Sequence, residues 1–280
     1  MNTTILPVDL KLESTDAIQV FNYTTREDII KTKIELSKNT ISFLKVGTKE
    51  VIGDDKTAQI DNQRFLVMKA GHCLMTEKIS NSSNIYQSIL LFFSDDEVKS
   101  FLTRHELYAN KSISQKTFYA FDYDTFILQF VDSLVWILSL PKETQQQMLK
   151  TKFEEIMLYL VHQNGADFLN AIVQNTDDKT VRLTNIVTNN RLKKLSLEEL
   201  AFLCNMSIST FKRAFSSQYH VSPMKWFTEQ RLKHAATLLR ANSSRPIDVY
   251  EAAGYENFSN FVQAFKKQFG QTPKQYQQHD

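Results

Sequence analysis

One stretch of sequence occurs twice near the C-terminal end, as SISTFKRAFSSQYHVSPMKW at Ser207–Trp226 and NFSNFVQAFKKQFGQTPKQY at Asn257–Tyr276. Two Phe residues and one Pro of the first copy recur 50 positions later in the second (261 − 211, 265 − 215 and 273 − 223). Further upstream, Leu200-Ala201 pairs with Val249-Tyr250 at an offset of 49, so the second copy has one extra residue between these points. Matches at constant spacing predict one structural unit that is present twice.

Each copy has the pattern of a helix-turn-helix, predicted at about 197–219 and about 247–269. In both copies a short apolar helix leads into a tight turn, and in the second copy Gly254 can supply a positive φ there. Ser207 and Asn257 then stand where a side-chain oxygen caps the N-terminus of a second helix. The paired Phe residues lie four positions apart and are expected to anchor this second helix to the first.

The opposite face of each second helix carries short polar and cationic side chains. Such groups can read base edges in the major groove of DNA. The predicted base-contacting residues are Ser209, Thr210, Lys212 and Arg213 in the first copy, and Ser259, Asn260 and Gln263 in the second. The predicted phosphate-contacting residues are Lys225, Lys266, Lys267 and Lys274.

A long helix is predicted between the copies, at residues 223–241, with Pro223 in its first turn. Nineteen residues at about 1.5 Å each give a rigid spacer of roughly 28 Å. Successive turns of B-DNA are about 34 Å apart. The spacing therefore indicates two reading helices that enter successive segments of the major groove on one face of a duplex.

The composition is that of a globular protein. The chain has 280 residues, of which 42% are hydrophobic and 23% are charged, which excludes disordered and low-complexity classes. The two cysteines, Cys73 and Cys204, are too few for a disulfide scaffold or a multi-cysteine zinc site. No signal-peptide pattern opens the chain and no apolar run is long enough for a membrane span, so a cytoplasmic protein without membrane contact is expected.

The net charge of +2 hides an asymmetry. Residues 181–280 carry 14 Lys+Arg and 7 Asp+Glu, a net charge of +7, whereas residues 1–180 carry 19 and 24, a net charge of −5. A basic segment attached to a mildly acidic one favours a polyanionic partner at one end of the chain.

The N-terminal part is predicted to be β-sheet followed by helices. Apolar segments such as Ile85–Phe93 are bounded by turn residues, and Tyr123–Leu140 then shows apolar residues at helical spacing. The predicted fold is therefore α+β with two domains, at 1–174 and 181–280, joined by a linker at 175–180.

The duplicated segment resembles the DNA-binding domain of the AraC/XylS family of bacterial transcription regulators, across residues 181–280. The resemblance implies a transcription factor, usually an activator, that acts on double-stranded DNA and works with RNA polymerase. Ser209, Lys212 and Arg213 match base-contacting positions of the family in the first copy. The residues that carry the resemblance are Leu200-Ala201, Ser207, Phe211, Arg213, Phe215, Arg231, Leu232, Ala235, Leu238-Leu239, Gly254-Tyr255, Phe261, Phe265, Lys266-Lys267, Gly270, Thr272-Pro273 and Tyr276.

Some positions depart from the family pattern. Tyr250 stands where the leading helix of the second copy has a small residue, and Pro246 stands where it has an aliphatic one. Gln263 takes a place where Arg is frequent. The second copy is therefore expected to pack differently and to read its bases more weakly.

The N-terminal part is similar to the cupin-like jelly-roll domains, with a helical hairpin, that many members of this family carry. The resemblance implies a domain that binds a small effector, a fatty acid or a protein antagonist and forms a homodimer, and nothing in the sequence decides among these ligands. The helix at Tyr123–Leu140 packs on the jelly roll or forms the dimer interface, and the candidate interface residues are Leu134, Trp136 and Leu138.

The alternative is a cupin-type β-sandwich enzyme with a DNA-binding appendix. A metal cupin needs clustered His residues and a carboxylate, but His72, His105 and His162 are separated by 33 and 57 positions. No nucleophile elbow, phosphate-binding loop or dinucleotide fingerprint occurs. We therefore expect no enzymatic activity, no catalytic residue and no metal or other cofactor.

Overall fold

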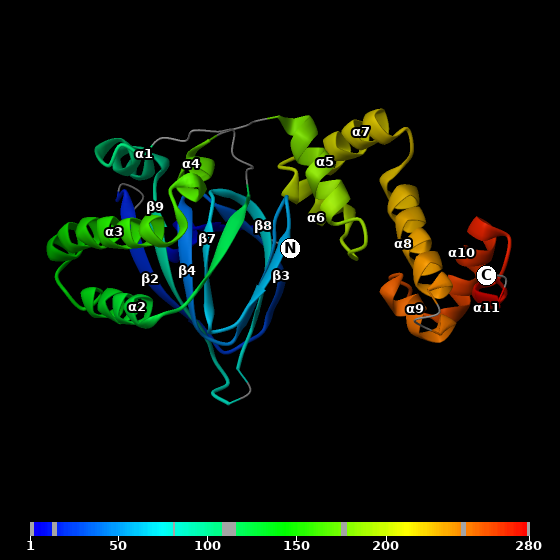
Figure 1. Ribbon diagram of the computed structural model, residues 1–280, viewed down its shortest axis with the longest axis horizontal. Coiled ribbons are helices and arrows are strands. Elements are labelled where there is room, and N and C mark those ends of the chain that lie inside the picture. Colours follow the sequence, from blue (N-terminus) through cyan, green and yellow to red (C-terminus); the bar gives the residue numbers. More distant parts are fainter. Residues whose placement is uncertain are drawn as a thin grey trace. The chain divides into compact units, whose positions relative to one another are not determined.

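The computed structural model describes residues 3–12, 16–80, 82–107, 116–174, 178–241 and 245–278. The chain divides into two compact units, Met1–Asp178 and Lys179–Asp280. The first unit is rich in β-sheet and the second is helical, so the fold is α+β (Figure 1). None of the helices in the described ranges is both long and apolar enough to cross a membrane.

The first unit contains two five-stranded sheets. Their neighbouring strands pair antiparallel, except for β1 and β3, which are parallel. The first sheet has the order β1 (Thr4–Leu6), β3 (Ile29–Leu36), β8 (Gly71–Lys78), β5 (Thr48–Ile52) and β6 (Thr57–Ile60). The second has the order β10 (Phe118–Asp122), β7 (Arg64–Met68), β4 (Asn39–Val46), β9 (Tyr86–Phe93) and β2 (Ile18–Thr25).

Helices cover one face of the second sheet, and the first sheet covers the other (Figure 1). Along β7, Phe65 and Val67 join the core under the helices, while Leu66 and Met68 join the core between the sheets. Because successive side chains of a strand point to opposite faces, a strand that is buried on both sides needs apolar residues without alternation. This explains the continuous apolar run in β9. The helices of this unit are η1 (Val8–Leu10), α1 (Asp95–Arg104), α2 (Thr125–Ile137), α3 (Lys142–Asn164) and α4 (Asp167–Val173).

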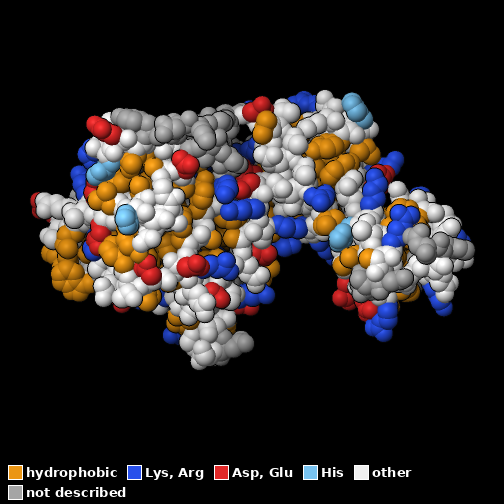
Figure 2. Space-filling model, viewed as in Figure 1, with side chains coloured by type: hydrophobic (Ala, Val, Ile, Leu, Met, Phe, Trp, Pro, Cys, Tyr) orange, Lys and Arg blue, Asp and Glu red, His pale blue; other side chains and the backbone are white. Residues whose placement is uncertain are grey.

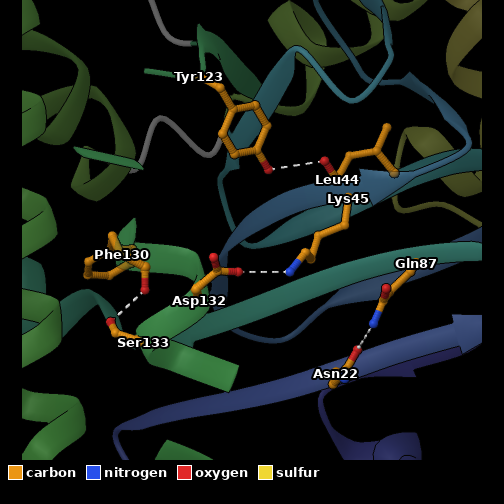
Figure 3. Close-up of polar contacts among 8 residues, drawn as sticks. All are labelled: Asn22, Leu44, Lys45, Gln87, Tyr123, Phe130, Asp132 and Ser133. Atoms are coloured by element: carbon orange, nitrogen blue, oxygen red, sulfur yellow. Dashed lines mark hydrogen bonds and ion pairs between the residues drawn. The ribbon is translucent and has the colours of Figure 1, made fainter. Parts of the chain in front are cut away.

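Helix α2 is shorter than the predicted Tyr123–Leu140. It begins after Asp124, whose carboxylate accepts a hydrogen bond from the Ile127 amide at 2.8 Å. Tyr123 lies outside the helix, and its hydroxyl donates to the Leu44 carbonyl at 3.1 Å (Figure 3). Lys45 and Asp132 add an ion pair of 3.0 Å between β4 and α2 (Figure 3). Strand β4 therefore contacts both the helix and the residue that lies two positions before it.

The second unit is built from seven described helices. Helix α8 packs against α7, α9, α10 and α11, so it forms the centre of the unit. The bounds are α5 (Lys179–Asn189), α6 (Leu197–Leu203), α7 (Ile208–Tyr219), α8 (Pro223–Arg240), α9 (Pro246–Ala252), α10 (Phe258–Phe269) and α11 (Pro273–Gln278).

The predicted linker at 175–180 is wrong at its C-terminal end. Residues 175–177 lie outside the described residues, and α5 already begins at Lys179, so the last two residues of the expected linker are helical. The reason is that Leu183, Ile186 and Val187 form the buried face of α5, and neither Lys179 nor Thr180 is a residue that prevents the helix from starting earlier. The second unit accordingly starts two residues earlier than expected.

Candidate nucleic-acid interface

The first helix-turn-helix consists of α6 and α7. Ser196 and Glu199 form a reciprocal capping box at the start of α6, with bonds of 3.1 and 2.6 Å. The turn places Asn205 at a φ of 53°, and the Met206 amide donates to the Ala201 carbonyl at 2.9 Å. Ser207 caps α7 by accepting a hydrogen bond from the Thr210 amide at 3.2 Å.

The second helix-turn-helix, α9 and α10, repeats this backbone geometry. Gly254 lies 49 positions after Asn205 and has a φ of 79°, and the Tyr255 amide donates to the Tyr250 carbonyl at 3.0 Å. Asn257 caps α10 by accepting a hydrogen bond from the Asn260 amide at 2.8 Å. A left-handed residue at the same point of each turn allows the sharp change of direction, and Asn and Gly are the residues that adopt it most readily.

Aromatic side chains hold each second helix in place. In the first copy, Phe215 lies 4.5 Å from Tyr219 and 5.9 Å from Trp226 between ring centroids. In the second, Phe265 lies 4.5 Å from Phe269 and 5.3 Å from Tyr276. Phe211, Phe215, Phe261 and Phe265 are all fully buried. Each second helix therefore has one fixed face, and its opposite face is available to solvent.

The predicted base-contacting residues lie on these available faces. Thr210 is half-buried, and its hydroxyl lies 2.9 Å from the Ser207 hydroxyl, so it contributes to the cap. Ser209 also lies within hydrogen-bond distance of Ser207, at 3.0 Å. The exposed members of the set are Ser209, Lys212, Arg213, Ser259, Asn260 and Gln263. In the described part of the chain, Lys212 and Arg213 are in no ion pair.

The predicted phosphate-contacting lysines are all exposed. Lys225 lies in the first turn of α8, Lys266 and Lys267 lie in the last turn of α10, and Lys274 lies in α11. Figure 2 shows Lys and Arg side chains over the α8–α11 part of the molecule. These positions leave the four ammonium groups free to approach the backbone of a nucleic acid.

The sequence patterns assign no role to two cations that contact the turn of the second copy. Arg231 of α8 packs across the turn of the second copy, because a Cβ added at Gly254 would lie 3.3 Å from its Cδ and Nε. Burial lowers the pKa of Arg231, although the nearby Tyr255 raises it. Lys194, which precedes α6, forms an ion pair of 3.0 Å with Glu256, the extra residue of the second turn. The sequence gives one hint of this ion pair, because the offset between the two copies changes from 49 to 50 at Glu256.

The three candidate dimer residues, two on α2 and Leu138 just after it, differ in their surroundings. Leu134 has no exposed surface and belongs to the core of the first unit, so its assignment to an interface is wrong. Its place at helical spacing from Phe130 puts it on the face that packs against the sheet. Trp136 is 60% exposed, and Leu138 is half-buried. Leu128 and Leu158 are also exposed, and Figure 2 shows apolar side chains gathered over the α2 and α3 part of this unit.

The described residues contain no group of three or more His, Cys, Asp or Glu that could hold a metal ion. His72 lies 3.9 Å from the carboxylate of Glu35. Cys73, its neighbour in β8, is buried, and this burial raises the pKa of its thiol to about 12. Because the thiolate is the nucleophilic form, Cys73 is unreactive at neutral pH.

Comparison with known proteins identifies both parts of the chain. A family profile described as the ExsA N-terminal regulatory domain matches residues 39–171, and one described as a helix-turn-helix domain matches residues 200–279. The chain is 31% identical over 129 residues to the virulence regulon transcriptional activator VirF of Yersinia enterocolitica. The aligned segment covers 46% of this chain and 48% of VirF. It is 30% identical over 128 residues to the HTH-type transcriptional regulator ExsA of Pseudomonas aeruginosa, which covers 45% of this chain and 46% of ExsA.

The chain thus spans about half the length of these two relatives. Among solved structures, an apo variant of ToxT from Vibrio cholerae is 13% identical, with a TM-score of 0.44 over 95% of this chain and 98% of that one. The first profile covers the sheet-rich unit from β4 into α4, and the second covers both helix-turn-helix copies except for the first residues of α6. The chain is thus similar to AraC-type bacterial transcription regulators in both parts, through a helix-turn-helix profile in its C-terminal part and an ExsA-type regulatory profile in its N-terminal part.

Proposed function

We propose that this protein is a sequence-specific DNA-binding transcription regulator that acts as an activator. The observation that carries the proposal is the structural repeat. Two copies share a left-handed turn residue, an N-cap and an aromatic anchor, and both leave a polar helix face exposed. A helix-turn-helix uses this arrangement to place its second helix in the major groove. The relatives named above carry the names of a transcriptional activator and a transcriptional regulator, which favours regulation over the enzymatic alternative.

The exposed residues of α7 and of α10 are proposed to contact different bases of the duplex. Arg213 and Lys212 suit guanine, because their N–H groups can donate to its O6 and N7, and Asn260 and Gln263 suit adenine, which offers one donor and one acceptor. Ser209, Thr210 and Ser259 supply hydroxyl contacts. Lys225, Lys266, Lys267 and Lys274 neutralise phosphates and carry no sequence information. Helix α8 connects the two reading helices and sets their separation.

The first unit is proposed to be a cupin-like sensor and dimerisation domain. Its two facing sheets support a closed β-structure, and the α2–α3 pair offers an apolar surface with Trp136 exposed and Leu138, just after α2, half-buried. An effector or a protein antagonist bound to this unit would shift the population of the DNA-competent homodimer. The dimer would contact RNA polymerase at the promoter, in the bacterial cytoplasm where the DNA lies.

Selection of bound sequences from a library of random duplexes tests this proposal. The full chain is expected to enrich two sequence blocks whose centres lie about 10 base pairs apart, one helical turn. Joint replacement of Lys212 and Arg213 by Ala should remove the first block and leave the second, while circular dichroism shows unchanged folding. Recovery of random sequences by the folded wild-type chain would contradict sequence-specific binding.

A further inference from the structure

The first unit encloses a cavity of about 110 Å³ that none of the sites described so far uses. Strands of both sheets line the cavity, and the short N-terminal segment β1–η1 contributes part of its wall. Most of the lining is apolar, for example Leu6, Ile34, Leu36, Met68, Met75 and Leu90. A dry cavity of about 150 Å³ with such a lining is large enough to take up benzene. The present cavity is smaller than that, so it limits a ligand to about one six-membered ring at most.

Charged and phenolic groups occupy one part of this apolar wall. Lys49 and Glu77 both line the cavity, and they are only 2% and 8% exposed. Their Nζ and Oε1 atoms lie 3.2 Å apart. Tyr23 lines the cavity beside them, and burial together with the Glu77 carboxylate raises the pKa of its hydroxyl well above the ordinary value. Burial and the same carboxylate also raise the pKa of Tyr86, so Glu77 faces one ammonium and two phenols.

Lys49 has a donor to spare. An ammonium group carries three N–H donors and accepts nothing. Within the described part of the chain its Nζ has two oxygen partners, the Ser42 hydroxyl at 2.9 Å and Glu77, and it also lies 5.8 Å from the centroid of the Tyr86 ring. A charged group buried this deeply is costly unless its donors are paired. Among the described residues two oxygens accept from Lys49, so a third N–H donor can meet a ligand oxygen in the cavity that Lys49 lines.

We infer that this cavity binds a small, uncharged, mainly apolar molecule that carries a single acceptor oxygen, such as a cyclic ketone or alcohol, with that oxygen on Lys49. The inference rests on the proposed function, in which the first unit is the regulatory part of the chain, and it specifies the chemistry of the effector. A carboxylate ligand would bring a second negative charge next to Glu77 in a medium that screens charge poorly. An amine would place a second positive charge beside Lys49. An uncharged oxygen completes the hydrogen bonds of Lys49 and adds no charge.

A series of compounds with one ring and different head groups tests this chemistry on the full chain. The series consists of cyclohexanone, cyclohexanol, cyclohexanecarboxylate, cyclohexylamine and methylcyclohexane. Ligands with so few atoms have limited affinity, so ligand-observed NMR titration is the suitable measurement. The ketone and the alcohol are expected to bind, and the carboxylate and the amine are expected to bind about tenfold more weakly or not at all. Tightest binding by the carboxylate, or binding by none of the compounds, overturns the inference.

Paired substitutions assign the head-group contact to Lys49. Lys49→Met combined with Glu77→Gln removes both charges and leaves no buried ion unpaired. This variant should bind cyclohexanone about tenfold or more weakly, the loss expected for a hydrogen bond to a charged group, and should keep its affinity for methylcyclohexane. The matched control is Lys45→Met with Asp132→Asn, which removes the exposed Lys–carboxylate pair of Figure 3 and should change neither affinity. Equal binding of the ketone by both variants contradicts the role of Lys49.

A cavity-filling variant gives a second, independent result. Leu90→Phe adds volume at the lining of the cavity and should remove binding of all five compounds. Retained binding in this variant would show that the ligands sit elsewhere and would overturn the inference. Affinity for the duplex selected from the random library, measured on the same preparations, separates the two proposals. Ligand binding without DNA binding refutes the proposed function alone, whereas DNA binding without ligand binding refutes the cavity alone.

Discussion

The two helix-turn-helix copies share their turns and differ in their leading helices. The equivalent hydrogen bonds to the carbonyls of Ala201 and Tyr250 are 2.9 and 3.0 Å long. The leading helix α6 nevertheless has a capping box and buries Leu200, Ala201 and Leu203, whereas α9 has no side-chain cap and buries Val249 alone. A tight turn permits few residues and few hydrogen-bond patterns, whereas a packed helix face tolerates different side chains as long as the volume is filled. The second copy therefore keeps the geometry of the motif with weaker support.

The largest expected effect comes from the aromatic anchors. Phe215→Ala and Phe265→Ala should each lower the free energy of unfolding of the second unit by about 3–5 kcal/mol, because each removes a fully buried ring and leaves a cavity. Phe215 should lie at the upper end, because its ring also lies 6.1 Å from Phe227 of α8. Denaturant unfolding followed by Trp226 fluorescence, in a Trp136→Phe background, measures both values. A loss below about 1 kcal/mol at either Phe would contradict its role as an anchor.

A reciprocal exchange at the equivalent positions of α6 and α9 sharpens the comparison. Ala201→Tyr should destabilise the second unit by about 1–3 kcal/mol, because Ala201 is 1% exposed and the larger side chain has no space. Tyr250→Ala should lower the free energy of unfolding less, because Tyr250 is only half-buried. Its ring centroid lies 6.0 Å from that of Phe258, and its hydroxyl donates a hydrogen bond to the Glu251 carboxylate at 3.0 Å. The same unfolding measurement compares the two variants. Equal losses would show that the two leading helices pack alike.

The capping box of α6 should have a smaller effect. Ser196→Ala removes the hydroxyl that accepts a hydrogen bond from the Glu199 amide. The free energy of unfolding should fall by about 1 kcal/mol. Ser196→Asp, which keeps a capping oxygen, is the matched control and should restore the stability. Hydrogen exchange of the α6 amides reads out the local effect, and unchanged protection in the Ala variant would exclude a stabilising cap.

The smallest effect is expected at a phosphate contact of the second copy. Lys267→Gln should weaken binding to all duplexes similarly and reduce the slope of log K against log salt by about one unit. Gln268, the exposed next residue, offers a control position at which Gln268→Ala should leave the slope unchanged. A slope of wild-type size in the Lys267 variant would remove this residue from the phosphate contacts.

The sequence specified the second unit better than the first. Local signals of Gly, Ser, Asn and Pro set the turns and helix ends of the repeat, and Pro246 fits because it occupies the first turn of α9, where no amide donor is needed. In the first unit, Cys73 and Ile34 are register partners 39 positions apart, and no local pattern reveals such pairing. The Lys49–Glu77 pair was not foreseen for the same reason, because it joins two strands that meet only in the folded sheet. Leu134 was misassigned because helical spacing shows which residues share a face but not which face is covered.

The central claim is that both exposed helix faces read bases of one duplex, and Arg213→Ala tests it most directly. Affinities are measured for the selected duplex and for duplexes changed at single base pairs, with Asn260→Ala as the companion variant in the second copy. The Arg213→Ala protein should lose about 1–3 kcal/mol of binding free energy on the selected duplex. It should also no longer discriminate between bases at one position of the first block. The corresponding change in the second block is expected for Asn260→Ala. Equal losses on matched and altered duplexes, for both variants, would contradict base reading by these helices.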